Sequence, residues 1–295
     1  MATNEIVSTS AGIGGAKGQA RSIGAILIDS GRLKIEDAVR ILRLQKERSL
    51  RFGDAGLQLG LITQADIDFA LSSQFDYPYL VRGESTVSQD LIAAYEPFSK
   101  QVEALRALRA QLMLRWFDDD PAHKALAIIS AKRKEGRSYI AANLAIAFSQ
   151  LGERTLLIDA DMRNPSQHLL FSLDNRAGLS AVLTGRGGSE TIQRIAALRD
   201  LSVLPAGVQP PNSPDLLARP MFSDYLRESA KEFDVILIDT PAAADSADAQ
   251  TITMRAGCAL VVARKNVSRF WQVQGIGAEA VHNSATIVGT VLNDY

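Results

Sequence analysis

The fold is decided by residues 128–152, which read IISAKRKEGRSYIAANLAIAFSQLG. This pattern predicts a strand, a loop and then a long helix. A loop in that position can receive a phosphate, because backbone N–H groups and the N-terminus of the following helix point toward it. The loop is also strongly cationic, which favours attraction of a phosphate group.

Short apolar runs alternate with helical patterns through the rest of this half of the chain. The predicted strands are residues 125–130, 155–160, 201–206, 234–239, 258–263 and 287–292. Continuous apolar strands separated by helices are typical of a buried parallel sheet. We therefore expect an α/β fold of the P-loop type, a mostly parallel sheet with helices on both faces, whose ligands bind beyond the carboxyl ends of the strands.

Acidic residues stand at two of those strand ends. The segment LLIDADMRNP (156–165) places Asp159 and Asp161 just past a strand, and FDVILIDTPA (233–242) places Asp239 past another. Carboxylates beside a phosphate-binding loop are what Mg²⁺ and an activated nucleophile require. The alternative is that these residues are surface caps, but three aspartates at strand ends in this order make that explanation weak.

The order of loop, Asp-x-Asp and apolar-Asp-Thr-Pro resembles the tyrosine autokinases of bacterial capsule and exopolysaccharide synthesis and the related cell-division and partition ATPases. Three further matches favour the kinase branch: the helix motif of Glu103, Arg106 and Arg109, the segment PPNSPDLL (210–217), and Asn293 after the last strand. The resemblance covers about two thirds of the chain. It is most specific for the exopolysaccharide chain-length-determinant kinase subfamily.

This resemblance implies a set of functional residues. Catalysis would involve Asp159, Asp161 and Arg137, and Mg²⁺ would be held by Ser138, Asp159 and Asp239. Tyr295 would be the phospho-acceptor. The resemblance also implies a homo-oligomeric ring formed through Glu103, Arg106 and Arg109, although these three could be ordinary helix pairs. ATP would bind Lys132, Arg133, Lys134, Glu135, Gly136, Arg137, Ser138, Tyr139 and Asn293.

The loop departs from the family pattern Pro-Gly-x-Gly-Lys-Ser-Thr, of which only Gly136 and Ser138 are unchanged. Arg137 takes the place of the phosphate-binding lysine. Lys134 replaces a glycine, and a positive φ there would cost ~1 kcal/mol or more. Three hypotheses follow: a tyrosine autokinase acting with an inner-membrane chain-length determinant, a catalytically degenerate nucleotide- or cyclic di-GMP-responsive scaffold, and a partition-type ATPase switch.

The N-terminal part repeats itself at a spacing of 29 residues. Gly24, Gly31, Asp37, Leu42 and Gln45 recur as Gly53, Gly60, Asp66, Leu71 and Gln74. Each copy predicts a short apolar helix, a glycine stop at Gly31 or Gly60, and a second, amphipathic helix. We expect the copies to pack together, because one helix pair cannot bury its own apolar face.

This repeat resembles the N-terminal domain of type II secretion and pilus ATPases, a tandem motif that binds cyclic di-GMP. The resemblance implies contacts from Gly24, Gln45, Arg51, Gly53 and Gln74. The first copy has its arginine one place early, at Arg21. The alternative is a helical docking module without a ligand.

Length and composition complete the expected organisation. The 295 residues carry a net charge of -1, which gives no overall bias toward nucleic acid or toward an anionic membrane, and the single cysteine, Cys258, fits a reducing cytosol. We expect a cytoplasmic protein that reaches the inner membrane only through a partner. The expected parts are a disordered arm at 1–20, the repeat domain at 21–80, a linker at 81–98 and the nucleotide-binding domain at 99–295.

Overall fold

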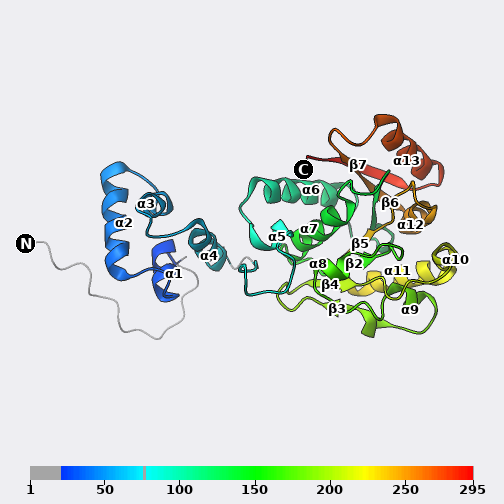
Figure 1. Ribbon diagram of the computed structural model, residues 1–295, viewed down its shortest axis with the longest axis horizontal. Coiled ribbons are helices and arrows are strands. Elements are labelled where there is room, and N and C mark those ends of the chain that lie inside the picture. Colours follow the sequence, from blue (N-terminus) through cyan, green and yellow to red (C-terminus); the bar gives the residue numbers. More distant parts are fainter. Residues whose placement is uncertain (1–20, 76–77, 295) are drawn as a thin grey trace, which may run out of the picture. The chain divides into compact units, whose positions relative to one another are not determined.

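The computed structural model describes residues 21–75 and 78–294, and the chain divides into two compact units, Met1–Tyr77 and Pro78–Tyr295 (Figure 1). The predicted arm at 1–20 lies outside the described residues. Among the described residues, no helix combines the length and the apolar character that a bilayer span demands.

The larger unit contains a seven-stranded sheet in the order β3-β4-β2-β5-β1-β6-β7. The six predicted strands are all present and are parallel to one another. The seventh, β3, is an antiparallel edge strand. It was missed because its two residues, Gln193 and Arg194, form no apolar run. The strands are β1 (Ala125–Ser130), β2 (Thr155–Asp159), β3 (Gln193–Arg194), β4 (Leu201–Leu204), β5 (Val235–Asp239), β6 (Cys258–Arg264) and β7 (Thr286–Asn293).

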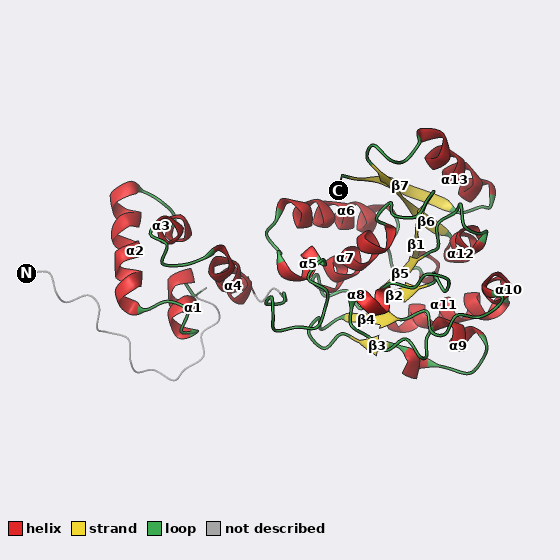
Figure 2. Ribbon diagram, viewed as in Figure 1, coloured by secondary structure: helices red, strands yellow, loops and turns green. Residues whose placement is uncertain are grey.

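Helices cover both faces of this sheet, as predicted (Figure 2). The α-helices are α5 (Ile92–Tyr95), α6 (Lys100–Arg115), α7 (Arg137–Ser149), α8 (Gln167–Leu170), α9 (Leu179–Leu183), α10 (Ser213–Ala218), α11 (Pro220–Glu232), α12 (Asp248–Ala256) and α13 (Phe270–His282), with 3₁₀ turns η1 (Pro121–His123) and η2 (Ser189–Thr191).

Alternate residues of each central strand enter two separate cores. In β1, Leu126 and Ile128 pack in the core formed with α5, α6 and α7. Ala127 and Ile129 pack in the opposite core, with α9 to α12. Because both faces of the strand are covered, its sequence is continuously apolar, and this is why the strands could be recognised from sequence.

Residues 81–98 do not form the expected linker. Leu91, Ala93, Ala94 and Tyr95 are buried in the core of the larger unit. Asn143 of α7 and Gln150, just after that helix, hold the backbone of this segment and of Pro78. Asn143 Oδ1 accepts the Ala93 N–H at 2.9 Å, and Gln150 Nε2 donates to the carbonyls of Pro78 and Ala93 at 2.9 and 2.8 Å. The mostly polar sequence of this segment suggested a linker, but it contains a short apolar stretch that is buried. The peptide groups of that stretch are hydrogen-bonded by side chains from a distant part of the chain.

The smaller unit contains the two predicted copies of a two-helix repeat. Its helices are α1 (Ile23–Asp29), α2 (Ile35–Arg48), α3 (Phe52–Gln58) and α4 (Gln64–Phe75). Gly31 and Gly60 follow the first helix of each copy with φ of 72° and 63°, which confirms them as helix ends. The copies share one core that includes Leu27, Ile41, Ala55 and Ala70.

A capping box starts α4 in the second copy. The Asp66 carboxylate accepts the Thr63 N–H at 2.9 Å, and the Asp66 N–H donates to Thr63 Oγ1 at 3.3 Å. Arg32, from the first copy, also donates to Asp66 at 3.2 Å. The first copy has Lys34 in place of Thr63, and α2 has no side-chain cap.

We predict that Asp66→Ala destabilises the smaller unit by about 1 kcal/mol, the usual cost of a lost cap. Burial alone would raise the pKa of Asp66, but hydrogen bonds from Thr63 and Arg32 outweigh it and lower the pKa below 3.8. The carboxylate's contribution is therefore present above that ordinary value and disappears as the pH falls through the lower, folded pKa. Hydrogen exchange of the α4 amides at neutral and acid pH measures this effect. Asp37→Ala, at the matching position of the first copy, should change α2 much less, and an equal effect there would contradict the assignment.

Candidate nucleotide-binding site

The loop between β1 and α7 is held in shape from inside. Gly136, at φ 93°, precedes the first residue of α7, and Lys134 also has a positive φ, 63°. Glu135 is buried: its carboxylate accepts the Lys132 N–H at 2.7 Å and the Ser268 hydroxyl. Lys132 and Lys134 are exposed on the outside of the same loop. Glu135 therefore braces the loop, and the lysines present the positive charge.

Arg137 occupies the centre of the site rather than its surface. Its side chain is 8% exposed. The guanidinium donates to Ser130 Oγ at 2.8 Å, to Asp239 at 3.3 Å and to Asp161 at 3.5 Å. Two buried carboxylates thus have a cation between them, and the sequence prediction that these residues lie together agrees with this arrangement.

The acidic strand ends lie side by side. Asp159 and Asp239 are paired in register on β2 and β5, and both are completely buried. Burial raises the pKa of Asp159 well above its ordinary value, and the Asp239 charge raises it further, against hydrogen bonds from the Gln167 and Ser166 N–H groups. Burial also raises the pKa of Asp239, although Arg137, Ser138 and Gln167 oppose that rise. Added positive charge at this site would therefore stabilise the ionised form of both carboxyl groups.

Several residues at the site were not identified from sequence. Gln167 Nε2 donates to Asp239 at 2.8 Å and to the Ser138 carbonyl at 3.2 Å. Arg133 pairs with Asp245 and also donates to Asn164 at 3.2 Å. Asn164 and Asp245 lie on irregular segments after β2 and β5, and Gln167 begins the four-residue helix α8, so no periodic pattern marks these side chains as functional.

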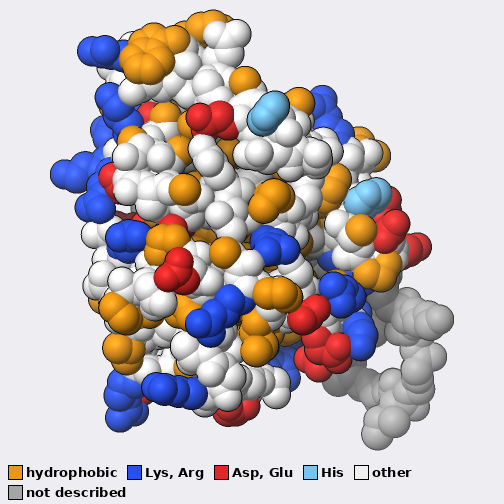
Figure 3. Space-filling model, turned by 90° about the vertical axis from the view of Figure 1, so that its right-hand side faces the viewer, with side chains coloured by type: hydrophobic (Ala, Val, Ile, Leu, Met, Phe, Trp, Pro, Cys, Tyr) orange, Lys and Arg blue, Asp and Glu red, His pale blue; other side chains and the backbone are white. Residues whose placement is uncertain are grey.

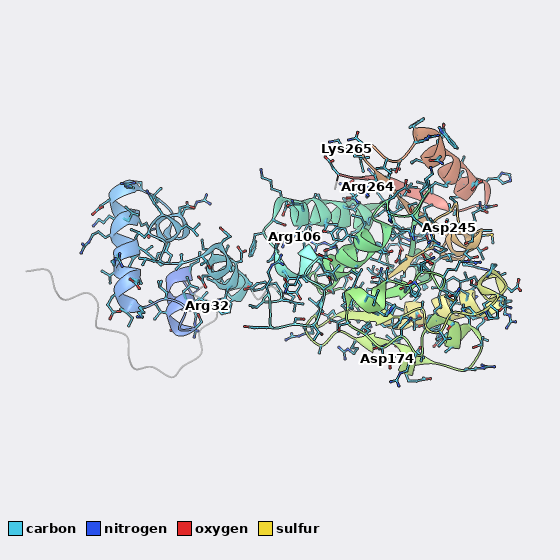
Figure 4. All side chains as sticks on the ribbon, viewed as in Figure 1. Arg32, Arg106, Asp174, Asp245, Arg264 and Lys265 are labelled. Carbon is cyan, nitrogen blue, oxygen red and sulfur yellow. The ribbon has the colours of Figure 1, made fainter. Side chains whose placement is uncertain are left out.

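The last two strands bring further groups to the loop. Asn293, at the end of β7, donates to the Glu135 carbonyl at 3.2 Å. A Cβ added to Gly136 would lie 2.1 Å from Asn293 Nδ2, so a glycine is needed there. Arg264, at the end of β6, donates to the Lys134 carbonyl at 3.1 Å, and Figure 4 shows it beside Lys265.

The oxygen donors present fit Mg²⁺ bound with a nucleotide. Among residues 21–75 and 78–294, no group of three acidic, histidine or cysteine side chains could hold a metal ion by itself. The Ser138 side chain, however, lies close enough to Asp239 to lower the pKa of that carboxyl, so a hydroxyl and a carboxylate are near each other. Mg²⁺ usually takes one or two such ligands and completes its shell with phosphate and water oxygens. Both Asp159 oxygens are engaged with backbone N–H groups at 2.9–3.2 Å.

The motif expected to form a ring lies on α6. The Glu103 side chain is 74% exposed and pairs with Arg106 at 3.4 Å. Arg109 donates to the Ala147 carbonyl at 2.6 Å, so it joins α6 to α7 within the unit. Of the three predicted residues, Glu103 is the one most available to a neighbouring copy.

In the smaller unit, two residues expected to contact cyclic di-GMP have packing roles. A Cβ on Gly24 would lie 3.0 Å from the Phe52 ring, and one on Gly53 would lie 3.0 Å from Ile67. Gln45 and Gln74 are partly buried, and Arg51 is exposed at the start of α3. Tyr295, the expected phospho-acceptor, lies outside the described residues.

We predict that Lys134→Gly stabilises the larger unit by about 0.5–1 kcal/mol, because the left-handed backbone costs a lysine more than a glycine. Equilibrium urea unfolding provides the measurement. Lys134→Ala is the matched control, since it removes the charge and keeps the strained backbone. If Lys134→Ala stabilised as much, charge repulsion rather than backbone strain would be the cause.

Comparison with known proteins agrees with this geometry. Residues 123–276 match the family model described as an AAA domain. The chain is 32% identical to tyrosine-protein kinase YwqD of Bacillus subtilis, over 71% of this chain and 87% of that protein. It is 31% identical to tyrosine-protein kinase wzc of Salmonella typhimurium, over 69% of this chain but only 28% of the much longer relative.

A solved structure supports the same assignment. The kinase domain of the Escherichia coli tyrosine kinase ETK superimposes with a TM-score of 0.67 and 28% identity, covering 74% of this chain and 85% of that domain. The sequence-based recognition and fold class are thereby confirmed. The chain belongs to the family of bacterial tyrosine-protein kinases.

Proposed function

We propose that this chain binds ATP with Mg²⁺ and acts as a tyrosine autokinase-type regulator of exopolysaccharide chain length and export. The observation that carries the proposal is the meeting of Ser138, Arg137 and three aspartates from two strand ends at the loop before α7. Charge neutralisation and positioning are the protein's main contributions to phosphoryl transfer.

Arg137 can replace the family's lysine as the cation for phosphate. Its two carboxylate contacts, at 3.3 and 3.5 Å, are longer than the 2.7–2.9 Å typical of charge-assisted hydrogen bonds. Exchange of these contacts for phosphate oxygens would require Mg²⁺ to supply the positive charge that the buried carboxylates lose. A planar guanidinium also binds phosphate oxygens in pairs, which a lysine cannot do.

We predict that Arg137→Ala and Asp239→Ala each weaken ATP binding by at least tenfold, which corresponds to about 1.4 kcal/mol. Calorimetric titration of the full chain with ATP, with and without Mg²⁺, measures this affinity. Arg137→Lys and Asp239→Asn test whether any loss reflects poor folding, since both keep the side chain's approximate volume. Unchanged affinity in both alanine variants would contradict the site.

The chain offers a matched control pair for that experiment. Arg154 and Asp234 form a bidentate pair at 2.6–2.8 Å at the opposite, amino ends of β2 and β5. Arg154→Ala and Asp234→Ala remove the same residue types next to the opposite ends of β2 and β5. We expect them to leave the affinity for ATP unchanged.

The reaction itself separates the alternatives. Phosphotyrosine formed on incubation with ATP and Mg²⁺, located at Tyr295 by mass spectrometry, supports the autokinase. Phosphate release without phosphotyrosine favours a partition-type ATPase switch. Nucleotide binding without phosphotyrosine or phosphate release favours a catalytically degenerate, nucleotide-responsive scaffold. The main observation in favour of that scaffold is Arg137, which takes the place of the family's phosphate-binding lysine.

The proposed setting is the cytoplasmic face of the inner membrane, where the chain would act with a chain-length determinant protein. We propose that copies associate head to tail through α6, with Glu103 reaching basic groups of the next copy, and that the contact closes into a ring. The exposure of Glu103 favours this arrangement. Light scattering with nucleotide and partner present would contradict it by showing only monomers at high concentration.

A second proposed ligand is cyclic di-GMP, bound by the smaller unit. The favouring observation is Arg51, an exposed cation at the start of α3 in a domain with two quasi-equivalent copies. A ligand with two equivalent guanylate halves suits such a pair. In the first copy, Arg21 stands one place early and pairs with Asp29 at 3.5 Å, so binding would depend mainly on Arg51.

We predict that Arg51→Ala lowers cyclic di-GMP affinity of the full chain at least tenfold, since a guanidinium can pair with phosphate and stack on guanine. Calorimetry gives the affinity, and it should fall with added salt. Arg48→Ala is the matched control, because Arg48 is also exposed and lies three residues away. Absence of heat in the wild type, or an equal loss in both variants, would leave this unit as a docking module.

A further inference from the structure

We propose that the segment between β6 and the first turn of α13 inserts into an anionic lipid surface and anchors the larger unit directly to the membrane. We call residues 264–271 the anchor segment. It comprises Arg264, Lys265, Asn266, Val267, Ser268, Arg269, Phe270 and Trp271.

Three large apolar side chains of the anchor segment are exposed to solvent. Phe270 is 79% exposed, Trp271 is 63% exposed and Val267 is 51% exposed. In Figure 3, hydrophobic side chains with Lys and Arg beside them occupy the top of the view, where α13 lies. Exposed clusters of this kind mark an interaction surface, because aromatic side chains are costly to leave in water.

The anchor segment is held rigidly in this exposed position. The Arg264 N–H donates to Ser268 Oγ at 2.7 Å, and the Ser268 N–H returns a bond to the Arg264 carbonyl at 2.9 Å. The Ser268 hydroxyl also donates to the buried Glu135. The apolar side chains are therefore exposed by a fixed turn and not by a loose loop.

The charge around these side chains is positive. Residues 264–278 contain Arg264, Lys265 and Arg269 and no Asp or Glu, in a chain whose net charge is -1. Asp294 faces the segment and pairs with Lys265 at 2.7 Å, which leaves the surface with a net positive charge. Basic groups next to exposed aromatic residues match the headgroups and the outer acyl region of an anionic leaflet.

A lipid surface explains the shape better than a protein partner does. Phe270 and Trp271 are adjacent exposed residues at the start of a helix, and neither lines the pocket beside Arg154 or the one beside Asp120. A protein docking site would need a broader face to reach the roughly 1,000 Å² that a specific interface buries. Two projecting rings need only the depth of a headgroup layer, where Trp is enriched.

Attachment at this segment would place the nucleotide loop next to the membrane. Arg264 binds the Lys134 carbonyl at 3.1 Å, and Ser268 binds Glu135. The same short segment therefore contacts both the candidate nucleotide loop and, by this proposal, the lipid headgroups.

Vesicle binding by the full chain tests the proposal. The variant Trp116→Phe leaves Trp271 as the one tryptophan, because the sequence contains two. With vesicles of phosphatidylcholine and phosphatidylglycerol, we expect co-sedimentation, a blue shift of Trp271 emission and quenching by brominated acyl chains. On vesicles of phosphatidylcholine alone, we expect binding weaker by on the order of tenfold or more.

Matched variants identify the groups responsible. Phe270→Ser with Trp271→Ser, and separately Lys265→Gln with Arg269→Gln, should each lower co-sedimentation on the order of tenfold or more. Leu114→Ser is the control, because Leu114 is 82% exposed on α6 and should not affect binding. Ellipticity confirms that each variant is folded.

Three outcomes would overturn the proposal. One is vesicle co-sedimentation of the Phe270→Ser, Trp271→Ser double variant at the wild-type level. Another is a Trp271 blue shift that grows with protein concentration without vesicles, which would show a second copy covering the segment. The third is a blue shift with polyglutamate but not with anionic vesicles, which would indicate an acidic protein partner.

Discussion

The structure depends on the burial of one arginine between carboxylates at the carboxyl edge of the sheet. Asp159 and Asp239 are adjacent because β2 and β5 are parallel neighbours, and both are fully enclosed. Buried carboxylates without a cation would be strongly destabilising. Arg137 supplies that cation to Asp239, and to Asp161 two residues beyond Asp159, from the first turn of α7, so the helix is tied electrostatically to the ends of two central strands.

The loop between β1 and α7 keeps its shape although few of its residues match the family's phosphate-loop pattern. Gly136 remains because Asn293 leaves no room for a Cβ. The Glu135 carboxylate accepts a hydrogen bond from the Lys132 N–H of the same loop. Lys134 adopts the left-handed backbone conformation, which is unfavourable for a residue with a side chain. The loop is thus stabilised by contacts from β6, β7 and the segment after β6, in addition to its local sequence.

Sequence alone predicted the parallel sheet, the helical repeat and the residues that gather at the strand ends. It did so because continuous apolar runs and strand-end carboxylates are local patterns. It could not predict that Arg137 turns inward or that Arg109 binds a carbonyl of α7, since those directions depend on neighbouring elements. Nor did it predict Gln167 or Ser268, which act through contacts between segments distant in sequence.

The packing of residues 78–98 also changes where the modules of this chain can be separated. Asn143 and Gln150 belong to the kinase-type unit, yet their amides bond peptide groups of Pro78 and Ala93. A unit beginning at residue 99 would lack the peptide groups that both amides bond. Recombination that joins this unit to a different N-terminal module would therefore have to exchange sequence upstream of Pro78. Residues 78–98 would stay with the larger unit as part of its fold.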